Sequence, residues 1–500
     1  MTSSALCSYE VMSLLKTLKK TPEKNLIGNF NALFGQCIPA FNQSRTFERA
    51  RNLALGLLSC MGRCTITGML SASGNQFKDW SAAYRLFKGE RMKLDELFGS
   101  IRKQVVLLNG SQQQHIYAHM DDTLLRKRGK KIHGTGWMRD PLGPPFASNF
   151  VWAQRFIQIS LSLLEKDTFG PSRAIPVDFV HCPPVQKPSK KATQQEIAVY
   201  RERQKKEKMS AVGIQRIINL RNKLDDDGHA STKLVLSVDG SYTNETVLRQ
   251  LPANVDLIGR IRKDAKLYQL PEPSTGQRGR KRSYGQELPT PEQIRQDNTI
   301  PYQPVEAWAA GKMRTFDVKL VKNIRWRKSK DRNLMLIIIR PVSYRLTKKS
   351  KLLYRNPAYL ISTDQNTEIR LLLQAYIRRW EIEVGFRDQK TLIGCGQAQV
   401  REKNAVQKVP AFISACYGMI LLASHITNLT ENKILPGPKW YKNQQKSRVT
   451  TGDILNRLRT ERWVQSVNIN FSDFVNIEEK LAKLGKMANP VFSSMFYIRN

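Results

Sequence analysis

One stretch of the sequence carries four polar side chains that would share one face of a helix. A phenol, a guanidinium, a carboxylate and an ammonium stand at Tyr376, Arg379, Glu383 and Lys390. At about 100° per residue, these positions fall within roughly 60° of one another on a helix. A carboxylate can hold a metal ion, and the two cationic groups can bind phosphate oxygens. The alternative is a solvated helix face held together by i,i+4 charge pairs.

Two further acidic sites follow strand-like runs. Asp239 comes directly after the largely apolar run Lys233–Val238, which is typical of a strand buried on both faces. A carboxylate there is costly without a partner, and the next residue, Gly240, permits close approach of a ligand. A shorter strand-like run, from Gln114, ends in Asp121-Asp-Thr. At both sites the alternative is a turn cap, because Asp and Thr favour turns.

Three carboxylates brought together would have a defined chemistry. Asp121, Asp239 and Glu383 would hold two Mg²⁺ ions through hard oxygen ligands, with Mn²⁺ as a substitute. Two such ions, about 3.5–4 Å apart, activate an attacking water or hydroxyl and stabilise the leaving oxygen, which suits phosphodiester cleavage and transfer. Glu381 competes with Glu383, but it lies roughly 160° away around a helix. We therefore predict that Glu383 faces the two aspartates.

A sheet and a long helix must position these groups. The composition predicts one helix from Asn366 to Leu392. A strand over 233–238, a helix over 244–251 and a strand over 256–262 follow the order of an α/β sheet.

The segment before Lys233 is more mixed. Residues 154–164 are predicted to form one or two strands, and the proline-containing residues 166–192 are predicted to be irregular. One charged helix is expected over 193–224. Asp225-Asp-Asp beside Gly228 is interpreted as a solvated helix end rather than a metal site.

Residues 263–365 interrupt the α/β alternation. Three strand-like runs, at 315–321, 334–339 and 359–362, predict a β-rich insertion. A basic loop precedes them, in which Arg280 and Lys281 would reach into a minor groove of DNA. A solvated loop is the alternative.

The two ends of the chain are predicted to be mostly helical. Residues 1–108 interleave basic and apolar positions at helical spacing, which fits a DNA-binding domain or a helical scaffold. An apolar run near 405–427 approaches membrane-span length, but Pro410 and Gly418 favour a buried core helix, and we expect no membrane partner.

The charge of the chain points to a nucleic-acid partner. There are 81 Lys+Arg against 42 Asp+Glu, which gives a formal net charge of +39. Neutralised phosphates release counterions, so DNA is favoured over an anionic membrane surface or an acidic protein. The basic turn after the first acidic site is predicted to contact the phosphate backbone through Arg126, Lys127, Arg128 and Lys130.

Cysteine usage suits a reducing compartment. Seven scattered cysteines do not make a disulfide scaffold, and no basic segment followed by an apolar core marks a signal peptide, so we expect a cytoplasmic protein. Cys60 and Cys64 have no matching second pair of metal ligands, and a packed helical face is favoured for them.

The spacing of Tyr376, Arg379, Glu383 and Lys390 resembles a known signature. It is similar, in residue type and spacing, to the Y-R-E-K motif of the insertion-sequence-four superfamily of bacterial transposases. Asp121-Asp-Thr resembles that family's first-aspartate motif, Asp-x-Ser/Thr, and the sequence around Asp239 resembles its second. A β insertion between the second Asp and the Glu is also a family feature. The resemblance covers about residues 110–430.

The resemblance implies a fold and a domain plan. The fold would be α/β, with an RNase H-like catalytic core interrupted by a β-strand insertion, an N-terminal helical domain and a mostly helical C-terminal region. The implied boundaries are 1–108 for the DNA-binding domain, 109–262 and 366–430 for the two parts of the core, 263–365 for the insertion and 431–500 for a C-terminal region with DNA or dimer contacts.

The resemblance also implies an activity. A DDE transposase uses Mg²⁺ to cut double-stranded DNA at the terminal inverted repeats of a mobile element and joins the 3′-hydroxyls to target DNA. In the family the signature Tyr and Arg contact a phosphate near the cleaved end, and the Lys contacts the DNA backbone; these roles pass to Tyr376, Arg379 and Lys390. Some relatives hold a flipped base on a Trp of the insertion, for which Trp308 and Trp326 are candidates.

The implied setting is a homodimer on DNA in a bacterial cell, associated with the nucleoid, because two ends must be cut and joined together. Two other functions fit the same residues. One is a transposase-derived DNA-binding protein that no longer cuts. The other is an RNase H-like repair or recombination nuclease that cuts without joining.

Overall fold

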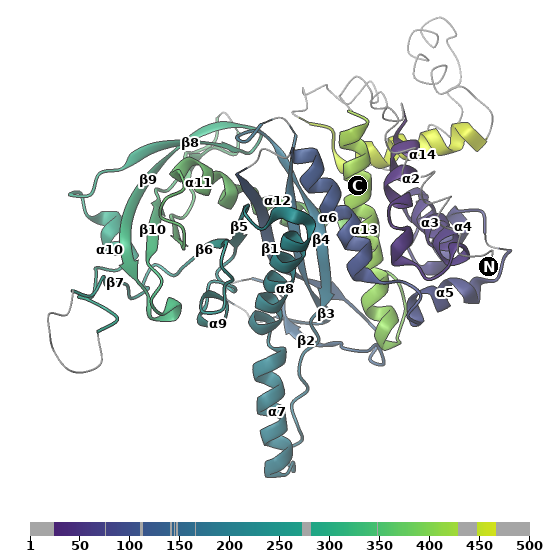
Figure 1. The fold of residues 1–500 in the computed structure, drawn as a ribbon, viewed down its shortest axis with the longest axis horizontal. Coiled ribbons are helices and arrows are strands. Elements are labelled where there is room, and N and C mark those ends of the chain that lie inside the picture. The colour runs from purple at the N-terminus through teal and green to yellow at the C-terminus, as the bar shows by residue number, and fades with distance from the viewer. Residues whose placement is uncertain are drawn as a thin grey trace, which may run out of the picture.

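A mixed β-sheet organises the computed structural model of the chain (Figure 1). The structure describes residues 25–466 except 76, 111–113, 141–142, 145, 147–148, 166, 273–281, 348 and 429–447. Two of the predicted DNA contacts, Arg280 and Lys281, lie outside the described residues.

Eleven strands form this sheet, and a separate hairpin joins β11 (Ser343–Tyr344) to β12 (Leu353–Tyr354). The strands of the sheet are β1 (His115–Arg126), β2 (Gly136–Arg139), β3 (Phe150–Leu164), β4 (Ser172–His181), β5 (Lys233–Val238), β6 (Val255–Arg260), β7 (Tyr268–Gln269), β8 (Gln303–Ala309), β9 (Lys312–Arg325), β10 (Leu334–Ile339) and β13 (Ala358–Ser362).

The sheet is antiparallel on both sides of a parallel centre. Its order is β2-β3-β1-β5-β6-β13-β10-β9-β7, with β4 paired to β3 and β8 paired to β9. Strand β1 is antiparallel to β3 and parallel to β5, which is in turn parallel to β6. Strand β13 pairs with β6, so the strands of residues 263–365, apart from the β11–β12 hairpin, continue the central sheet.

Helices cover the sheet and build the N-terminal region (Figure 1). The helices are α2 (Leu26–Gly35), α3 (Ser44–Ser59), α4 (Ile66–Ala72), α5 (Trp80–Lys88), α6 (Leu94–Asn109), α7 (Gln194–Glu207), α8 (Met209–Leu224), α9 (Glu245–Leu248), α10 (Pro291–Gln296), α11 (Ile369–Arg378), α12 (Trp380–Thr391), α13 (Lys403–Ile426) and α14 (Thr451–Ser466). Helix α7 projects away from the rest of the molecule and contributes no buried residue.

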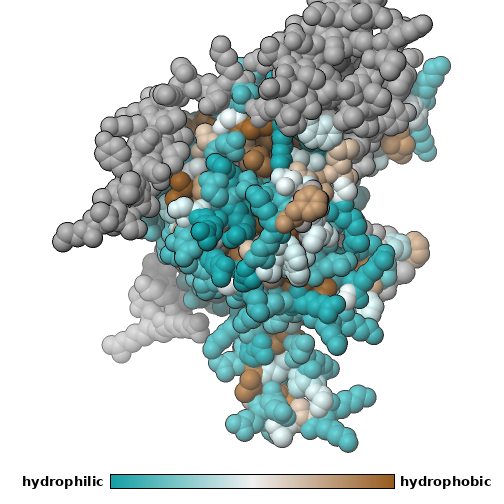
Figure 2. Space-filling view, turned by 90° about the vertical axis from the view of Figure 1, so that its right-hand side faces the viewer, coloured by the Kyte–Doolittle hydropathy of each residue, from teal (hydrophilic) through white to brown (hydrophobic). Residues whose placement is uncertain are grey.

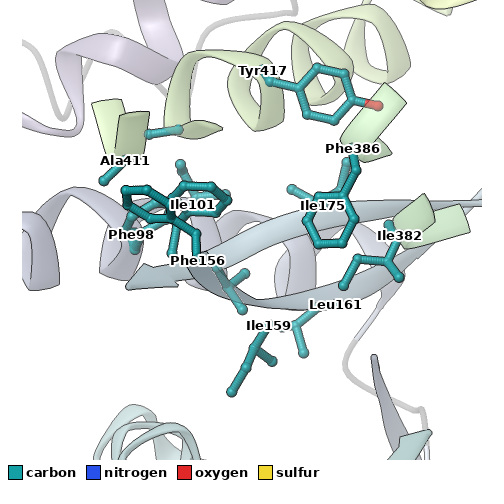
Figure 3. Close-up of a cluster of buried hydrophobic side chains, with 14 of the residues drawn as sticks. Phe98, Ile101, Phe156, Ile159, Leu161, Ile175, Ile382, Phe386, Ala411 and Tyr417 are labelled. Atoms are coloured by element: carbon teal, nitrogen blue, oxygen red, sulfur yellow. The ribbon is translucent and has the colours of Figure 1, made fainter. Parts of the chain in front are cut away.

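Helix α13 is the centre of the hydrophobic core. It packs on β4 and on α2, α5 and α6, and Figure 3 shows side chains of α6, β3, β4, α12 and α13 meeting in one cluster. Among the described residues, α13 is the one helix that is long enough and apolar enough to cross a membrane. However, 89% of its most apolar stretch is buried inside the protein. The prediction of a buried core helix near 405–427 is therefore confirmed.

The outer face of the N-terminal helices is mostly hydrophilic. Figure 2 shows polar residues over this face with only scattered hydrophobic ones. Their apolar side chains instead join the core, as where the Phe34 and Phe87 rings meet Phe412 of α13 edge-on. The predicted helical N-terminal region is thus packed onto the core through its apolar stripe.

Two predicted helices are each divided in the structure. The expected helix over 366–392 is α11 and α12, which meet at Arg379, where N–H groups bond three residues back instead of four. The expected helix over 193–224 is α7 and α8, because Lys208 between them has an extended backbone (φ −62°, ψ 147°). Periodicity alone was wrong about both, since a break of one residue leaves the apolar pattern nearly unchanged.

One other expectation was also wrong, and another holds only in part. Residues 172–181 form β4 rather than irregular structure, because Pro176 lies at a register shift of an edge strand, where a missing N–H is tolerated. The Asp225-Asp-Asp stretch follows the end of α8 with Asp225 and Asp226 exposed, as expected, but the Asp227 carboxylate is 2.7 Å from the guanidinium of Arg102. That long-range partner is not visible in the local sequence.

Candidate active site

Two of the predicted acids lie on neighbouring parallel strands. In the pairing of β1 with β5, Met120 stands opposite Val238. The next residues are Asp121 and Asp239, so both carboxylates leave the sheet at the same level. Strand β5 is buried from Leu234 onward, which makes this a rigid support for Asp239.

The turn after β5 holds Asp239 in place. The Asp239 carboxylate accepts hydrogen bonds from the Ser241 backbone N–H (2.9 Å) and hydroxyl (3.1 Å). The Thr243 hydroxyl donates to the backbone carbonyl of Asp239 (2.9 Å). Thr243 can lie so close only because Gly259 of β6 lacks a side chain; a Cβ atom there would be 2.1 Å from the Thr243 Oγ1.

One guanidinium joins Glu383 of helix α12 to Asp121. Arg379 Nη1 is 2.8 Å from Asp121 Oδ2, and Arg379 Nη2 is 2.7 Å from Glu383 Oε1. The Arg379 and Asp121 side chains are each 15% exposed, and that of Glu383 is 34% exposed. Asp121, Arg379 and Glu383 therefore meet at the edge of the sheet, next to Asp239.

Burial and a neighbouring acid both act on the Asp121 carboxyl. Burial, followed by the charge of Asp239, raises the pKa of Asp121 to about 7, although the charge of Arg379 acts in the opposite direction. Two carboxylates close together repel each other, and Arg379 compensates only in part.

The neighbouring acids face other partners. Asp122 lies on the opposite side of β1, as strand alternation requires, and its carboxylate is 3.2 Å from Arg155 Nε. Glu381 is paired with Arg448 at 2.7 Å. Neither acid is paired with the guanidinium that joins Asp121 to Glu383.

Comparison with known proteins places the chain in a family. Residues 34–328 match the family model described as DDE superfamily endonuclease. The chain belongs to this family. The matched residues include Asp121 and Asp239 and end before Glu383. A search of the curated proteins found no match.

Endonucleases of this family act on DNA with divalent metals such as Mg²⁺, and the donor set here suits such an ion. Asp121, Asp239 and Glu383 offer only carboxylate oxygens, which are hard ligands. As placed, no three acidic, His or Cys side chains of the described residues converge closely enough to hold a metal. The Arg379 guanidinium stands between two of the acids, so a metal would bind after Glu383 leaves Arg379.

The other signature residues lie at different distances from the acids. Tyr376 hydrogen-bonds to Arg379 and lies within electrostatic range of Asp239 and Arg260. Burial lowers the pKa of Lys390, which lies nearer to Arg126 and Asp122. Tyr376 thus belongs to the cluster of acids, whereas Lys390 lies farther along α12.

The four basic side chains of the predicted turn after β1 differ in exposure. Arg128 and Lys130 are exposed, and Arg126 is exposed although it contacts Asp140 (2.7 Å). Lys127 instead donates to the carbonyl of Gly396 (2.6 Å). Three of the four side chains are therefore open to a partner from solvent.

A basic groove starts next to Asp239 in this endonuclease. It has a volume of about 1080 Å³ and extends from Gly240 to the strands of residues 263–365. Its cationic lining residues are Arg260, Arg262, Lys263, Lys266, Arg295, Arg327 and Lys328, against Asp264 and Glu292. Trp326 forms part of its wall with Lys328 over the ring (4.8 Å), whereas Trp308 lies on β8 against Gln374.

Arg260 is a candidate site residue that no local motif marks. It ends β6, the next parallel strand after β5, and lies close to Tyr376. A signal was present, because ends of adjacent parallel strands meet at one edge of a sheet.

Proposed function

We propose that this endonuclease is a DNA transposase of the insertion-sequence-four type, which cuts the ends of a mobile element and joins their 3′-hydroxyls to target DNA. The observation that carries the proposal is the cluster in which Arg379 joins Asp121 to Glu383 beside Asp239. Glu383 lies beyond the residues that match the family model, yet it reaches the acids within them.

The sheet topology supports an RNase H-like core. Three antiparallel strands, β4, β3 and β1, are followed by β5 and β6, both parallel to β1. The first acid stands on the central strand β1, and the second follows the adjacent β5. Helix α12 supplies the third acid from outside the sheet.

Asp121, Asp239 and Glu383 would hold Mg²⁺, with Mn²⁺ as a substitute. When bound, the metal supplies a Lewis acid for the phosphodiester and lowers the pKa of a bound water or hydroxyl. Once Glu383 leaves Arg379, the guanidinium is free to bind the phosphate as a fork of N–H donors. Tyr376, already hydrogen-bonded to Arg379, orients that guanidinium or donates to the same phosphate.

The basic groove would hold DNA next to the acids. It begins at Gly240, one residue after Asp239, and its cationic groups outnumber its acidic ones. The two acids of the groove are engaged by arginines, Asp264 by Arg262 and Glu292 by Arg295. The charge that DNA would meet is therefore set by the other cationic groups, which are Arg260, Lys263, Lys266, Arg327 and Lys328. A homodimer on DNA follows from the need to cut and join two ends together.

The test is strand cleavage of a DNA fragment carrying the element's own ends, with Mg²⁺ and with EDTA. Asp239→Asn and Glu383→Gln keep size but lose the charge that holds metal, so they should abolish metal-dependent cutting while end binding persists. Glu381→Gln and Asp122→Asn are the matched controls, since these acids pair with Arg448 and Arg155. Normal cutting by Glu383→Gln together with loss in Glu381→Gln would show that the wrong face of α12 is assigned.

The same assay separates the alternatives. Products in which the cut 3′-end is joined to a second DNA support a transposase. Metal-dependent cuts without joining, on any branched DNA, indicate a repair or recombination nuclease. End binding without any cut indicates a transposase-derived binding protein.

A further inference from the structure

The loop between α3 and α4 brings two thiols together outside the acidic cluster. Cys60 follows the last residue of α3, and Cys64 precedes Thr65, the N-cap of α4. The Sγ atoms of Cys60 and Cys64 lie 3.6 and 3.9 Å from the same acceptor, the carbonyl oxygen of Gly62. The two thiols also hydrogen-bond to each other. The expectation that they lie on a packed helical face was therefore wrong.

A small cavity gives solvent-sized molecules access to this pair. Its volume is about 230 Å³, and Cys60 and Cys64 both line it, together with Arg459 of α14 and Thr391 at the end of α12. All six described cysteines are buried, Cys60 and Cys64 included, but of these six only Cys60 and Cys64 line this cavity. Burial raises the pKa values of the other four thiols, which are Cys37, Cys182, Cys395 and Cys416.

The surroundings make the two thiols unequal. The hydrogen bond with Cys64 lowers the pKa of Cys60, and the positive charge of Arg459 acts in the same direction against desolvation. The Arg459 guanidinium is held by the backbone carbonyls of Leu58 and Cys60, each 3.1 Å away. For Cys64, the hydrogen bond to Cys60 and burial both raise the pKa. One thiol is thus favoured as a thiolate, and its neighbour stays protonated.

A metal site does not account for this pair. Zinc takes four ligands in its structural sites, and no group of three or more His, Cys, Asp or Glu side chains in the described ranges could hold a metal. Two thiols that share a cavity and differ in protonation have another chemistry, in which one attacks an oxidant and the other resolves the product.

We propose that Cys60 and Cys64 form an oxidisable dithiol site that a peroxide converts to an intramolecular disulfide. The Cys60 thiolate attacks one peroxide oxygen, the O–O bond breaks, and the leaving hydroxide takes up a proton to become water. The Cys64 sulfur then displaces the hydroxyl of the Cys60 sulfenic acid, which leaves as a second water with the Cys64 proton. Two thiols and one hydrogen peroxide thus give one disulfide and two waters.

The disulfide would form beside the segment that follows α12. The Cys64 backbone N–H donates to the Gln397 side chain (2.8 Å), and a Cβ atom on Gly394 would lie 2.7 Å from the Cys64 Cβ. The site is nevertheless separate from Asp121 and its partners, so its oxidation is measured without any DNA substrate and does not depend on the proposed transposase activity.

The test is peptide mapping of the full-length chain after treatment with hydrogen peroxide and alkylation of the remaining thiols. All samples carry Cys7→Ser, because Cys7 lies outside the described residues and would add a reaction of its own. We expect a Cys60–Cys64 crosslinked peptide. Before oxidation, we expect alkylation of Cys60 at neutral pH to be at least about tenfold faster than that of Cys395, since the thiolate is the nucleophile.

Two variants assign the roles. In Cys64→Ser, oxidation should stop at a Cys60 sulfenic acid that dimedone traps, and in Cys60→Ser, Cys64 should remain reduced. The proposal is overturned if wild-type Cys60 is alkylated no faster than Cys395, a measurement that needs no cysteine variant at this site. It is equally overturned if Cys64 oxidises at the wild-type rate in Cys60→Ser.

Discussion

Arg379 stands where the acidic cluster needs positive charge. Its guanidinium contacts Asp121 and Glu383 at once, and all three side chains are at least partly withdrawn from water. In the absence of metal it keeps two carboxylates close to Asp239 that would otherwise repel each other. Metal binding and release of Arg379 are therefore expected to be linked.

Arg379→Ala should lower the stability of the metal-free protein and enlarge the stabilisation that Mn²⁺ gives. Removing one partner of a buried ion pair costs about 3–5 kcal/mol, and the lower end is expected because Glu383 is partly screened by water. The measurement is Tm with EDTA and with Mn²⁺. Arg387→Ala is the matched control, since this exposed arginine of α12 contacts, among the acids that the structure describes, only its neighbour Asp388. An equal Mn²⁺ response in wild type and Arg379→Ala would contradict the linkage.

The buried His119 side chain should make the folded protein less stable in acid. It is fully buried between the hydroxyls of Ser237 (2.6 Å) and Ser162 (2.7 Å), and burial, aided by Arg378 and Arg379, lowers its pKa to about 3. Below pH ~6.5, His119 is protonated in the unfolded chain but stays neutral in the folded protein. The contribution of His119 is therefore present above pH ~6.5 and declines as the pH falls toward ~3, by up to about 1.4 kcal/mol per pH unit.

The measurement for His119 is Tm as a function of pH from neutral to mildly acidic conditions. His119→Gln should be less stable than wild type at neutral pH, because it loses packing, but its Tm should fall less steeply below pH ~6. His133→Gln serves as the control, because the His133 side chain is exposed. Parallel curves for wild type and His119→Gln would show that another group carries the acid response.

The local sequence points to the candidate acids but not to the groups that distinguish them from their neighbours. The angle between Glu381 and Glu383 on a helix separated those two, because that angle depends only on local geometry. The partners that engage the rejected acids, Arg448 for Glu381 and Arg155 for Asp122, come from distant parts of the chain. No local pattern contains that information.

The sequence predicts where helices and strands occur better than it predicts where a helix is interrupted. Strands β5, β6, β9, β10 and β13 and helix α13 lie where the apolar patterns placed them, because burial on a sheet or in a core leaves a strong signal. The break between α11 and α12 leaves no such signal in the sequence, since the backbone of Arg379 remains helical (φ −51°, ψ −32°). The joining of the insertion strands to the central sheet depends on pairing between distant strands.

Gly259 of β6 gives a prediction at the level of a strand contact. In Gly259→Ala the new Cβ would lie 2.1 Å from the Thr243 Oγ1 and 2.8 Å from a methyl group of Val238. The turn that carries Asp239 must shift, at a cost of about 1–3 kcal/mol. We expect a lower Tm and a loss of DNA cleavage of about a hundredfold, as small displacements of reacting groups produce.

The control for Gly259 is a glycine with open space. Gly35→Ala adds a Cβ that meets nothing within 4 Å at the end of α2, so stability should change by less than about 0.5 kcal/mol. Wild-type cleavage by Gly259→Ala would mean that the Asp239 turn tolerates displacement.

At the scale of the whole molecule, charge and shape describe a basic surface. The net charge of +39 is spread over the chain, but the groove beside Asp239 concentrates cationic side chains next to the acids. Helix α7 is also rich in Arg and Lys, yet it projects away from the sheet, and several of its charges pair within the helix (Figure 1). Composition could predict a DNA partner, whereas only the fold separates these two basic regions.

Salt dependence distinguishes the groove from net charge alone. Affinity for end-containing DNA should fall by about 10³–10⁵ between about 50 and 200 mM salt if six to ten phosphates are contacted, a range typical of such proteins. The triple variant Arg260→Ala, Lys263→Ala and Lys328→Ala should reduce the slope of log K against log salt by about 0.9 per lost contact. Fluorescence anisotropy of labelled DNA measures both quantities.

The matched control removes the same charge from α7 through Arg201→Ala, Lys205→Ala and Lys206→Ala, all exposed positions. Both triple variants lower the net charge by three, so any difference between their slopes reports position rather than total charge. A smaller slope for the groove variant alone places DNA beside Asp239, where cleavage requires it. Equal slopes of log K against log salt for the two triple variants would mean that DNA responds to the overall charge of the protein. That result would contradict the assignment of the groove as the DNA-binding site.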